Sequence, residues 1–201
     1  MTKLQKQLSK FIEDYKFELS KTVLDLNTHK VHNIIKIIRS TILNKKKIFT
    51  CGNGGSASVS NHFLCDFNKG VKHFSKKKIQ PKVISLSNSI ENITAIANDE
   101  NFNEIFKNQL ENYLEKGDLL IAFSCSGNSK NIINALKFAK KKRCKTILIT
   151  GFKKSVKYTD IHLNVNVKNY GISEDVFQSI MHISSQFLKI EFNKRGSREY
   201  L

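Results

Sequence analysis

Lys47–Ser56 reads KIFTCGNGGS, a short apolar strand followed directly by a loop of glycine, asparagine and serine. A second loop of the same kind, SCSGNS at 124–129, follows the apolar run DLLIAFS at 118–124. A helical pattern comes after each loop, so the chain passes twice from strand through polar loop into helix. This order is typical of α/β folds, whose ligands bind at the carboxyl ends of the strands.

Three more β-rich runs complete the pattern: KVISLS (82–87), KTILIT (145–150) and IHLNVN (161–166). Helical patterns alternate with the five runs, near residues 55–70, 90–97, 102–115, 128–142 and 173–194. The alternation predicts a parallel sheet, and the unbroken apolar stretch LLIAF predicts that helices cover both of its faces. We therefore expect a doubly wound, three-layer α/β/α fold.

The first 45 residues carry apolar side chains at helical spacing, with a break near Asn27–Thr28, and predict two helices ahead of the sheet. Such a pair packs either on its own domain or on another subunit. The length of 201 residues and the hydrophobic content of 40% suit one domain. We expect a single domain over 1–201, with the helical pair at 1–45 and the α/β core at 46–201.

Composition narrows the classes of function. No apolar run approaches the roughly 20 residues that span a bilayer, and the charged, amphipathic start is unlike a signal peptide, so we expect a cytoplasmic protein without membrane contact. The four cysteines are scattered without CxxC spacing and are expected to be reduced. The net charge of +17 comes from lysines without interleaved aromatic residues, which argues against specific nucleic-acid binding but would attract anionic substrates.

The two polar loops have the chemistry of a phosphate site. Glycine lets the backbone approach a ligand closely, serine hydroxyls donate to phosphate oxygens, and a helix N-terminus offers free N–H groups. Neither loop has the spacing of a nucleotide-binding motif, so we expect no nucleotide cofactor. The alternative is a pair of turns that each carry a serine helix cap, but two such loops at equivalent strand ends favour the phosphate site.

Polar side chains also repeat every four residues on two of the predicted helices. His62 and Asp66 share one face of the helix after the first loop. Glu174, Gln178 and His182 form a polar stripe on the last helix, whose other faces are apolar. A carboxylate and a histidine suffice for a general acid–base reaction in which a proton leaves one atom and returns to another.

Four segments carry a resemblance to a known family: CGNGGSASVSNHF (51–63), AIANDENFNEIF (95–106), SCSGNSKNIINALKFAKKK (124–142) and ITGF (149–152). In these segments the sequence resembles the sugar isomerase (SIS) superfamily, and within it the sedoheptulose 7-phosphate isomerases, also called phosphoheptose isomerases. The resemblance implies a five-stranded, flavodoxin-like parallel sheet and a homotetramer with active sites at subunit interfaces. It also implies conversion of sedoheptulose 7-phosphate to D-glycero-D-manno-heptose 7-phosphate for bacterial surface polysaccharide.

The resemblance assigns roles to single residues. Asp66 would be the catalytic base and His182 its acid partner. Similar enzymes carry Glu where this chain has Asp66 and Gln where it has Glu174. Aspartate is one methylene shorter, and a misplacement of about 1 Å can cost roughly 100-fold in rate. The residues expected to bind the substrate, with the serines contacting the phosphate, are Asn53, Gly54, Ser56, Asp99, Ser124, Cys125, Ser126, Ser129 and Glu174.

Some relatives bind zinc at the four positions that match His62, Asp66, Glu174 and His182, so one Zn²⁺ per subunit is a candidate cofactor. The alternative is that His62 packs internally and Glu174 caps the start of its helix, since Ser173–Asp175 also reads as a helix N-terminus. Both interpretations remain open from the sequence. Lys153 or Lys154, after ITGF, could also approach an anion.

A second class of function is a non-catalytic binding protein, since the same superfamily includes proteins that associate with a replication initiator and others that sense sugar phosphates. The presence of His62, Asp66 and His182 favours an enzyme, because a binding module has no chemical need for an acid/base pair.

Overall fold

The computed structural model describes residues 1–152 and 156–193, and its centre is a sheet of five parallel strands in the order β2-β1-β3-β4-β5. The strands are β1 (Lys47–Gly52), β2 (Lys82–Ser85), β3 (Leu119–Ser124), β4 (Lys145–Thr150) and β5 (Ile161–Asn164). All four pairings are parallel. The predicted five-stranded parallel sheet is confirmed.

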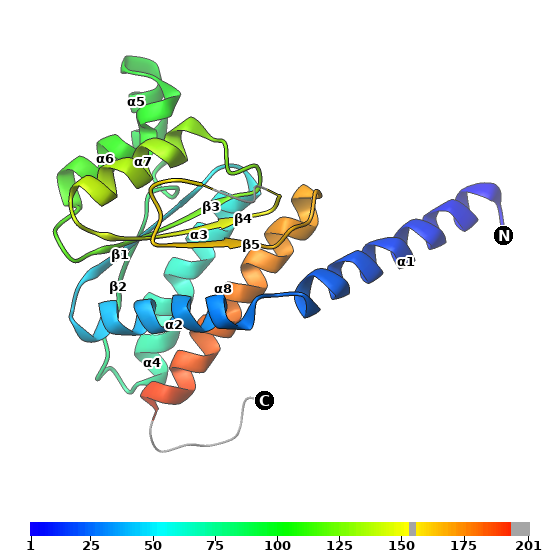
Figure 1. Cartoon of the computed structure of the whole chain (residues 1–201), viewed down its shortest axis with the longest axis horizontal. Coiled ribbons are helices and arrows are strands. Elements are labelled where there is room, and N and C mark those ends of the chain that lie inside the picture. The colour runs from blue at the N-terminus through cyan, green and yellow to red at the C-terminus, as the bar shows by residue number, and fades with distance from the viewer. Residues whose placement is uncertain (153–155, 194–201) are drawn as a thin grey trace.

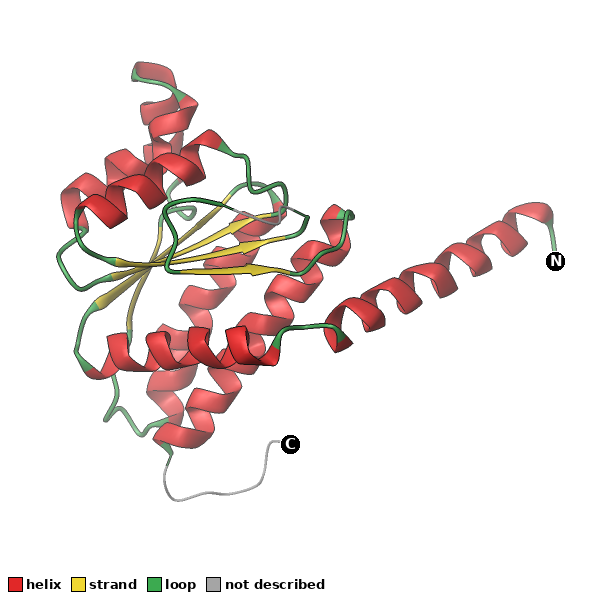
Figure 2. Ribbon diagram, in the orientation of Figure 1, coloured by secondary structure: helices red, strands yellow, loops and turns green. Residues whose placement is uncertain are grey.

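Helices cover both faces of the sheet (Figure 2), which confirms the three-layer prediction. One face is covered by α2 (Thr28–Leu43), α3 (Gly55–Cys65) and α8 (Tyr170–Phe192), and the other by α6 (Ile105–Tyr113) and α7 (Lys130–Lys141), as Figure 1 shows. Helix α5 (Ile90–Asp99) packs on α6 and projects away from the sheet. The remaining helical segments are α1 (Lys3–Leu24), the π-helix η1 (Asp66–Val71), α4 (Lys72–Phe74) and the 3₁₀ turn η2 (Phe102–Glu104).

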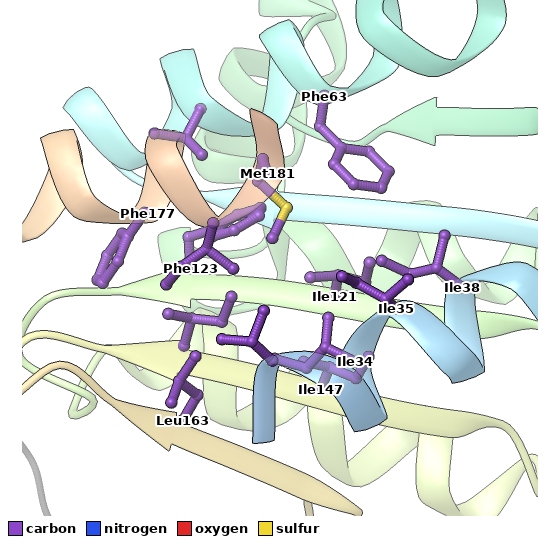
Figure 3. Close-up of a cluster of buried hydrophobic side chains, with 14 of the residues drawn as sticks. Ile34, Ile35, Ile38, Phe63, Ile121, Phe123, Ile147, Leu163, Phe177 and Met181 are labelled. Atoms are coloured by element: carbon purple, nitrogen blue, oxygen red, sulfur yellow. The ribbon is translucent and has the colours of Figure 1, made fainter. Parts of the chain in front are cut away.

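The sheet divides the hydrophobic core in two, because successive side chains of a strand point to opposite faces. In β3, Ile121 and Phe123 belong to one cluster, whereas Leu120 and Ala122 belong to the other. The first cluster brings side chains of α2 and α8 onto the sheet (Figure 3), with Met181 of α8 among them. Every residue of β3 is buried, as the apolar run LLIAF predicts.

Helix α1 extends away from the sheet layers (Figure 1). The hydroxyl of Tyr15 donates to the carboxylate of Asp175 in α8 at 2.6 Å, which holds the inner half of α1 against the body. The outer half exposes the large apolar side chains of Leu4, Leu8, Phe11 and Ile12, and Phe17 is exposed in the inner half. Within residues 1–152 and 156–193, no helix is both long and apolar enough to cross a bilayer.

Most helix ends differ by a few residues from the sequence-based prediction, and two of the differences affect the site. The helix predicted over 55–70 changes at Asp66 from α-helix to π-helix. The last helix begins at Tyr170 rather than Ser173, because the side chain of Asn169 accepts a hydrogen bond from the N–H of Ile172 and caps it there. Glu174 therefore lies in the second turn, and the interpretation of Glu174 as a helix cap is wrong.

Candidate active site

The two serine–glycine loops lie side by side because β1 and β3 are neighbours in the sheet, with Gly52 opposite Phe123. A pocket of about 330 Å³ opens between the loops and the start of α8. Its lining includes eight of the residues predicted to bind substrate, Asn53, Gly54, Ser56, Ser124, Cys125, Ser126, Ser129 and Glu174, together with Gly55, Phe123 and Tyr170. Neither Phe123 nor Tyr170 was predicted from the sequence.

Two helices begin at this pocket, and neither has a side chain that caps its N-terminus. Gly54, with a φ of 56°, precedes α3, and Ser129 precedes α7 without a side-chain cap hydrogen bond. The serine-cap alternative therefore does not describe these loops. In these first turns the N–H of Ala57 donates to the Gly54 carbonyl, and the N–H of Ile132 donates to the side chain of Asn131. The N–H groups ahead of them are left for another acceptor, and a phosphate is the acceptor that such helix ends favour.

The loop side chains form a connected polar set. The hydroxyls of Ser124 and Ser129 lie 3.4 Å apart, and the N–H of Gly127 donates to Ser124 at 3.1 Å. The amides of Asn53 and Asn131 exchange two hydrogen bonds, at 3.0 and 2.9 Å, which tie the first loop to α7. These contacts fix the walls of the pocket before any ligand binds.

Glu174 enters the pocket from α8 and reaches the first loop. Its Oε1 accepts a hydrogen bond from the Ser56 hydroxyl at 3.3 Å and lies 3.8 Å from the Cys125 thiol. Its Oε2 lies against Gly55, where a side chain would collide with it. Burial raises the pKa of the Cys125 thiol to about 11, so this cysteine is a neutral donor rather than a nucleophile at neutral pH.

A second group of polar side chains lies farther along α8. The Nε2 atoms of His62 and His182 are 3.4 Å apart. They lie 3.7 and 3.9 Å from the two carboxylate oxygens of Asp66. The Gln178 amide contacts His182 Nε2 at 2.9 Å. The predicted base and acid therefore lie next to each other, on η1 and α8.

The same three residues have the chemistry of a metal site. One donor atom each from His62, Asp66 and His182 lie within 4.8 Å of one another. Two imidazoles and one carboxylate, with a position left for water or substrate, are a common catalytic zinc set. Glu174, the fourth predicted ligand, is not part of this group, because its carboxylate turns to Ser56. The residues present therefore fit a divalent metal with three ligands.

One predicted contact, Asp99, lies away from the pocket. Asp99 is exposed at the end of α5, where the Asn98 amide donates to it at 2.8 Å, and it does not line the pocket of its own chain. Lys153 and Lys154 fall outside the described residues.

Two residues that sequence reasoning missed touch Asp66. The Ser185 hydroxyl donates to it at 2.9 Å, and the Lys189 ammonium lies 3.9 Å away. Ser185 follows His182 by one helical turn, and Lys189 follows Ser185 by another, so the helical spacing of the polar stripe was the available signal.

Comparisons with known proteins agree on one family. The family model described as "SIS domain" matches residues 11–151. A protein of Thermoplasma acidophilum named "probable phosphoheptose isomerase" is 34% identical over 182 residues, which is 89% of this chain and 97% of that protein. The phosphoheptose isomerase of Aliarcobacter butzleri is 40% identical over 64% of this chain and 67% of its own. The solved structure of a phosphoheptose isomerase from Neisseria gonorrhoeae shares the fold, with a TM-score of 0.79, 22% identity and coverage of 92% of this chain and 98% of that one.

Proposed function

Since this chain belongs to the SIS domain family, and within it to the phosphoheptose isomerases, we propose that it converts sedoheptulose 7-phosphate to D-glycero-D-manno-heptose 7-phosphate. The reaction is an aldose–ketose isomerisation, and its product would serve surface-polysaccharide synthesis. The observation that carries the proposal is the contact of Asp66 with His182, at 3.9 Å. His182 belongs to α8, and the start of the same helix borders the serine-lined pocket.

The pocket between the loops is the proposed phosphate site. It supplies serine hydroxyls and two uncapped helix N-termini, which favour an anion without a buried lysine. The acid/base pair lies about 12 Å farther along α8, counted from Glu174 to His182 at the helical rise. The phosphate of the open-chain sugar is on its last carbon and the reaction takes place at the first two, so a site extended along α8 suits this substrate.

The proton transfers are assigned to this chain's own side chains. Asp66 would remove the proton from the hydroxyl-bearing first carbon and return it to the second carbon, through an enediol. His182 would exchange protons with the two oxygens. Gln178, 2.9 Å from His182 Nε2, would orient the imidazole ring.

Zinc is the cofactor that we propose, held by His62, Asp66 and His182, whose donor atoms are grouped as a three-ligand site requires. With zinc bound, the ligating nitrogen of His182 would no longer exchange protons, and the metal would stabilise the enediolate oxygens in its place. A bound zinc ion supplies a Lewis acid that polarises a carbonyl oxygen. Metal analysis of protein purified without chelators checks the proposal, and less than about a tenth of an equivalent per chain would contradict this set.

A homotetramer in the cytoplasm, with active sites at subunit interfaces, completes the proposal. The exposed apolar side chains of α1 supply a surface for a second copy of the chain. Asp99 lies outside the pocket of its own chain, which suits a site that a neighbouring subunit completes. Light scattering of the variant with Leu8→Glu and Phe11→Glu, beside the wild type, tests the role of α1, and an unchanged mass would contradict it.

The reaction is tested by NMR on purified protein with sedoheptulose 7-phosphate. Wild type should form the aldose phosphate, and Asp66→Asn and His182→Ala should each lower the rate by at least about 100-fold, the usual contribution of acid–base catalysis. Equal background rates in all three proteins would contradict an enzymatic role and favour a non-catalytic sugar-phosphate binder.

A further inference from the structure

We propose that Ser185 and Lys189, neighbours on α8, are positioning residues that hold the carboxylate of Asp66 in its catalytic place. The inference rests on the proposed function, because Asp66 is the base of that reaction. It concerns the residue that is one methylene shorter here than in the enzymes that the sequence resembles.

The contacts of Asp66 are divided evenly between its two oxygens. Oδ2 accepts the hydrogen bond from Ser185 at 2.9 Å and lies 3.9 Å from His182 Nε2. Oδ1 lies 3.9 Å from the Lys189 ammonium and 3.7 Å from His62 Nε2. Each oxygen therefore faces one histidine of the reacting group and one further side chain of α8. Ser185 and Lys189 therefore fix the rotation of the Asp66 carboxylate, and neither takes the place of a histidine.

Ser185 is well suited to this role because it is fully buried and lies on a long helix. Its hydroxyl has one proton and two acceptors within reach, the Asp66 carboxylate at 2.9 Å and the His182 carbonyl at 3.2 Å. The carboxylate is both closer and charged, so the hydrogen bond to Asp66 is the stronger one. A buried hydroxyl on a rigid element determines the position of its partner more closely than water does.

Lys189 reaches Asp66 by crossing the π-helix. Its side chain passes Gly70, where an added Cβ would lie 2.8 Å from the Lys189 Cε atom, and its ammonium lies 5.7 Å from the ring centre of Phe74. Only 21% of the lysine side chain is exposed. The π-helix, Gly70 and Phe74 together form the path along which a long cation approaches a short carboxylate, and π-helical turns are frequent at functional sites.

A catalytic carboxylate must be held closely, because a displacement of about 1 Å can cost roughly 100-fold in rate. Glutamate would carry its carboxylate one methylene farther from η1. In this chain Ser185 and Lys189, which belong to α8, hold the two carboxylate oxygens of Asp66 from the side opposite η1. The two contacts thus offset the shorter side chain in this chain.

The test compares kcat and KM of variants for sedoheptulose 7-phosphate. Ser185→Ala and Lys189→Met should each lower kcat by about 10-fold, the typical value of a hydrogen bond or ion pair to a charged group, with KM changed less than about twofold. Lys189→Arg should restore most of kcat. Gly70→Ala displaces the flexible end of Lys189 and should act like Lys189→Met.

Matched control variants separate a loss of Asp66 positioning from a general loss of structure. Ser184→Ala removes the adjacent buried serine, whose hydroxyl donates to the Ile180 carbonyl, and should leave kcat near wild type. Lys69→Met removes an exposed lysine of η1 and should do the same. Thermal unfolding of every variant identifies any protein that has lost its fold.

The same Ser185→Ala substitution in the Asp66→Glu variant tests whether Ser185 acts through Asp66. In Asp66→Glu the carboxylate is displaced from Ser185, so Ser185→Ala should cost less than about twofold there, the mark of two residues that act through one contact. Equal losses in both backgrounds, or a kcat within about twofold of wild type for Ser185→Ala and Lys189→Met, would overturn the inference. An inactive wild type would instead contradict the proposed function.

Discussion

The hydroxyl of Ser56, at the start of α3, donates a hydrogen bond to the carboxylate of Glu174, in the second turn of α8, across 3.3 Å. A serine hydroxyl has one proton to donate. While Glu174 accepts it, Ser56 cannot donate to a phosphate, and the carboxylate also places a negative charge in the pocket proposed for an anion. Glu174 is therefore expected to oppose phosphate binding.

Glu174→Gln should tighten the binding of inorganic phosphate by about 5- to 10-fold, because the change removes the charge and weakens the hold on Ser56. Calorimetric titration measures this dissociation constant directly. Glu91→Gln, an exposed change on α5, is the control and should leave the constant unchanged. An equal or weaker affinity in Glu174→Gln would show that the carboxylate does not compete with phosphate.

The fold and the pocket could largely be predicted from the sequence because they depend on local patterns. The apolar run of β3 and the loop SCSGNS after it are both continuous in the chain. In a parallel sheet the carboxyl ends of all strands lie at one edge. Two loops of the same composition at those ends therefore had to lie near each other once β1 and β3 were neighbours.

The direction of the Glu174 side chain and the contacts of Asp66 could not be predicted in this way. Helical spacing places Glu174 and His182 on one stripe, but it does not say that Glu174 turns to the space left by Gly55. The change to a π-helix at Asp66 has no periodic signal, and it decides which residues of α8 meet the carboxylate. Asn169 lies before the predicted start of α8, so the capping of the helix there was also missed.

The zinc affinity of variants should show whether three residues bind the metal or whether Glu174 is a fourth ligand. His62→Ala should weaken zinc binding by at least about 10-fold. Removing a residue that only hydrogen-bonds to a metal ligand already lowers metal affinity by about that factor, and removing a ligand should lower it at least as much. Glu174→Gln should change it by less than about threefold, because Glu174 lies outside the group of donor atoms. Competition with a fluorescent chelator measures both constants. A large loss in Glu174→Gln would instead support the four-ligand set predicted from the sequence.

Two glycines of the first loop should respond differently to alanine. A Cβ at Gly52 would meet the backbone of Ser56, which cannot move without displacing α3. Gly52→Ala should therefore lower the free energy of unfolding by about 2–4 kcal/mol, the cost of strain in a packed site.

The three atoms nearest to a Cβ at Gly55 all belong to the end of the Glu174 side chain, which can rotate away. Gly55→Ala should cost less than about 1 kcal/mol in stability while it changes phosphate affinity. Urea unfolding and phosphate titration of both variants provide the comparison. Equal destabilisation by the two changes would contradict the proposed difference.

Asp160 should make the stability of the fold dependent on acid pH. Burial is the largest single influence and raises the pKa of its carboxyl, but hydrogen bonds from Lys140 and Thr146 outweigh it and leave the pKa below its usual value. Their distances to the carboxylate are 2.7 Å from the Lys140 ammonium and 2.8 Å from the Thr146 N–H. Because the folded pKa is below the unfolded one, the carboxylate stabilises the fold above the unfolded pKa of about 4.

That stabilisation is lost as the pH falls through the lowered pKa of the folded state. Asp160→Asn should therefore cost about 1–2 kcal/mol at pH 7, where an amide replaces a charged acceptor of the β4 backbone. The difference in unfolding free energy between wild type and variant should shrink as the pH falls below about 4. Urea unfolding across this range measures it, with the exposed Asp14→Asn as control. A difference that stays constant with pH would mean that the charge of Asp160 contributes nothing.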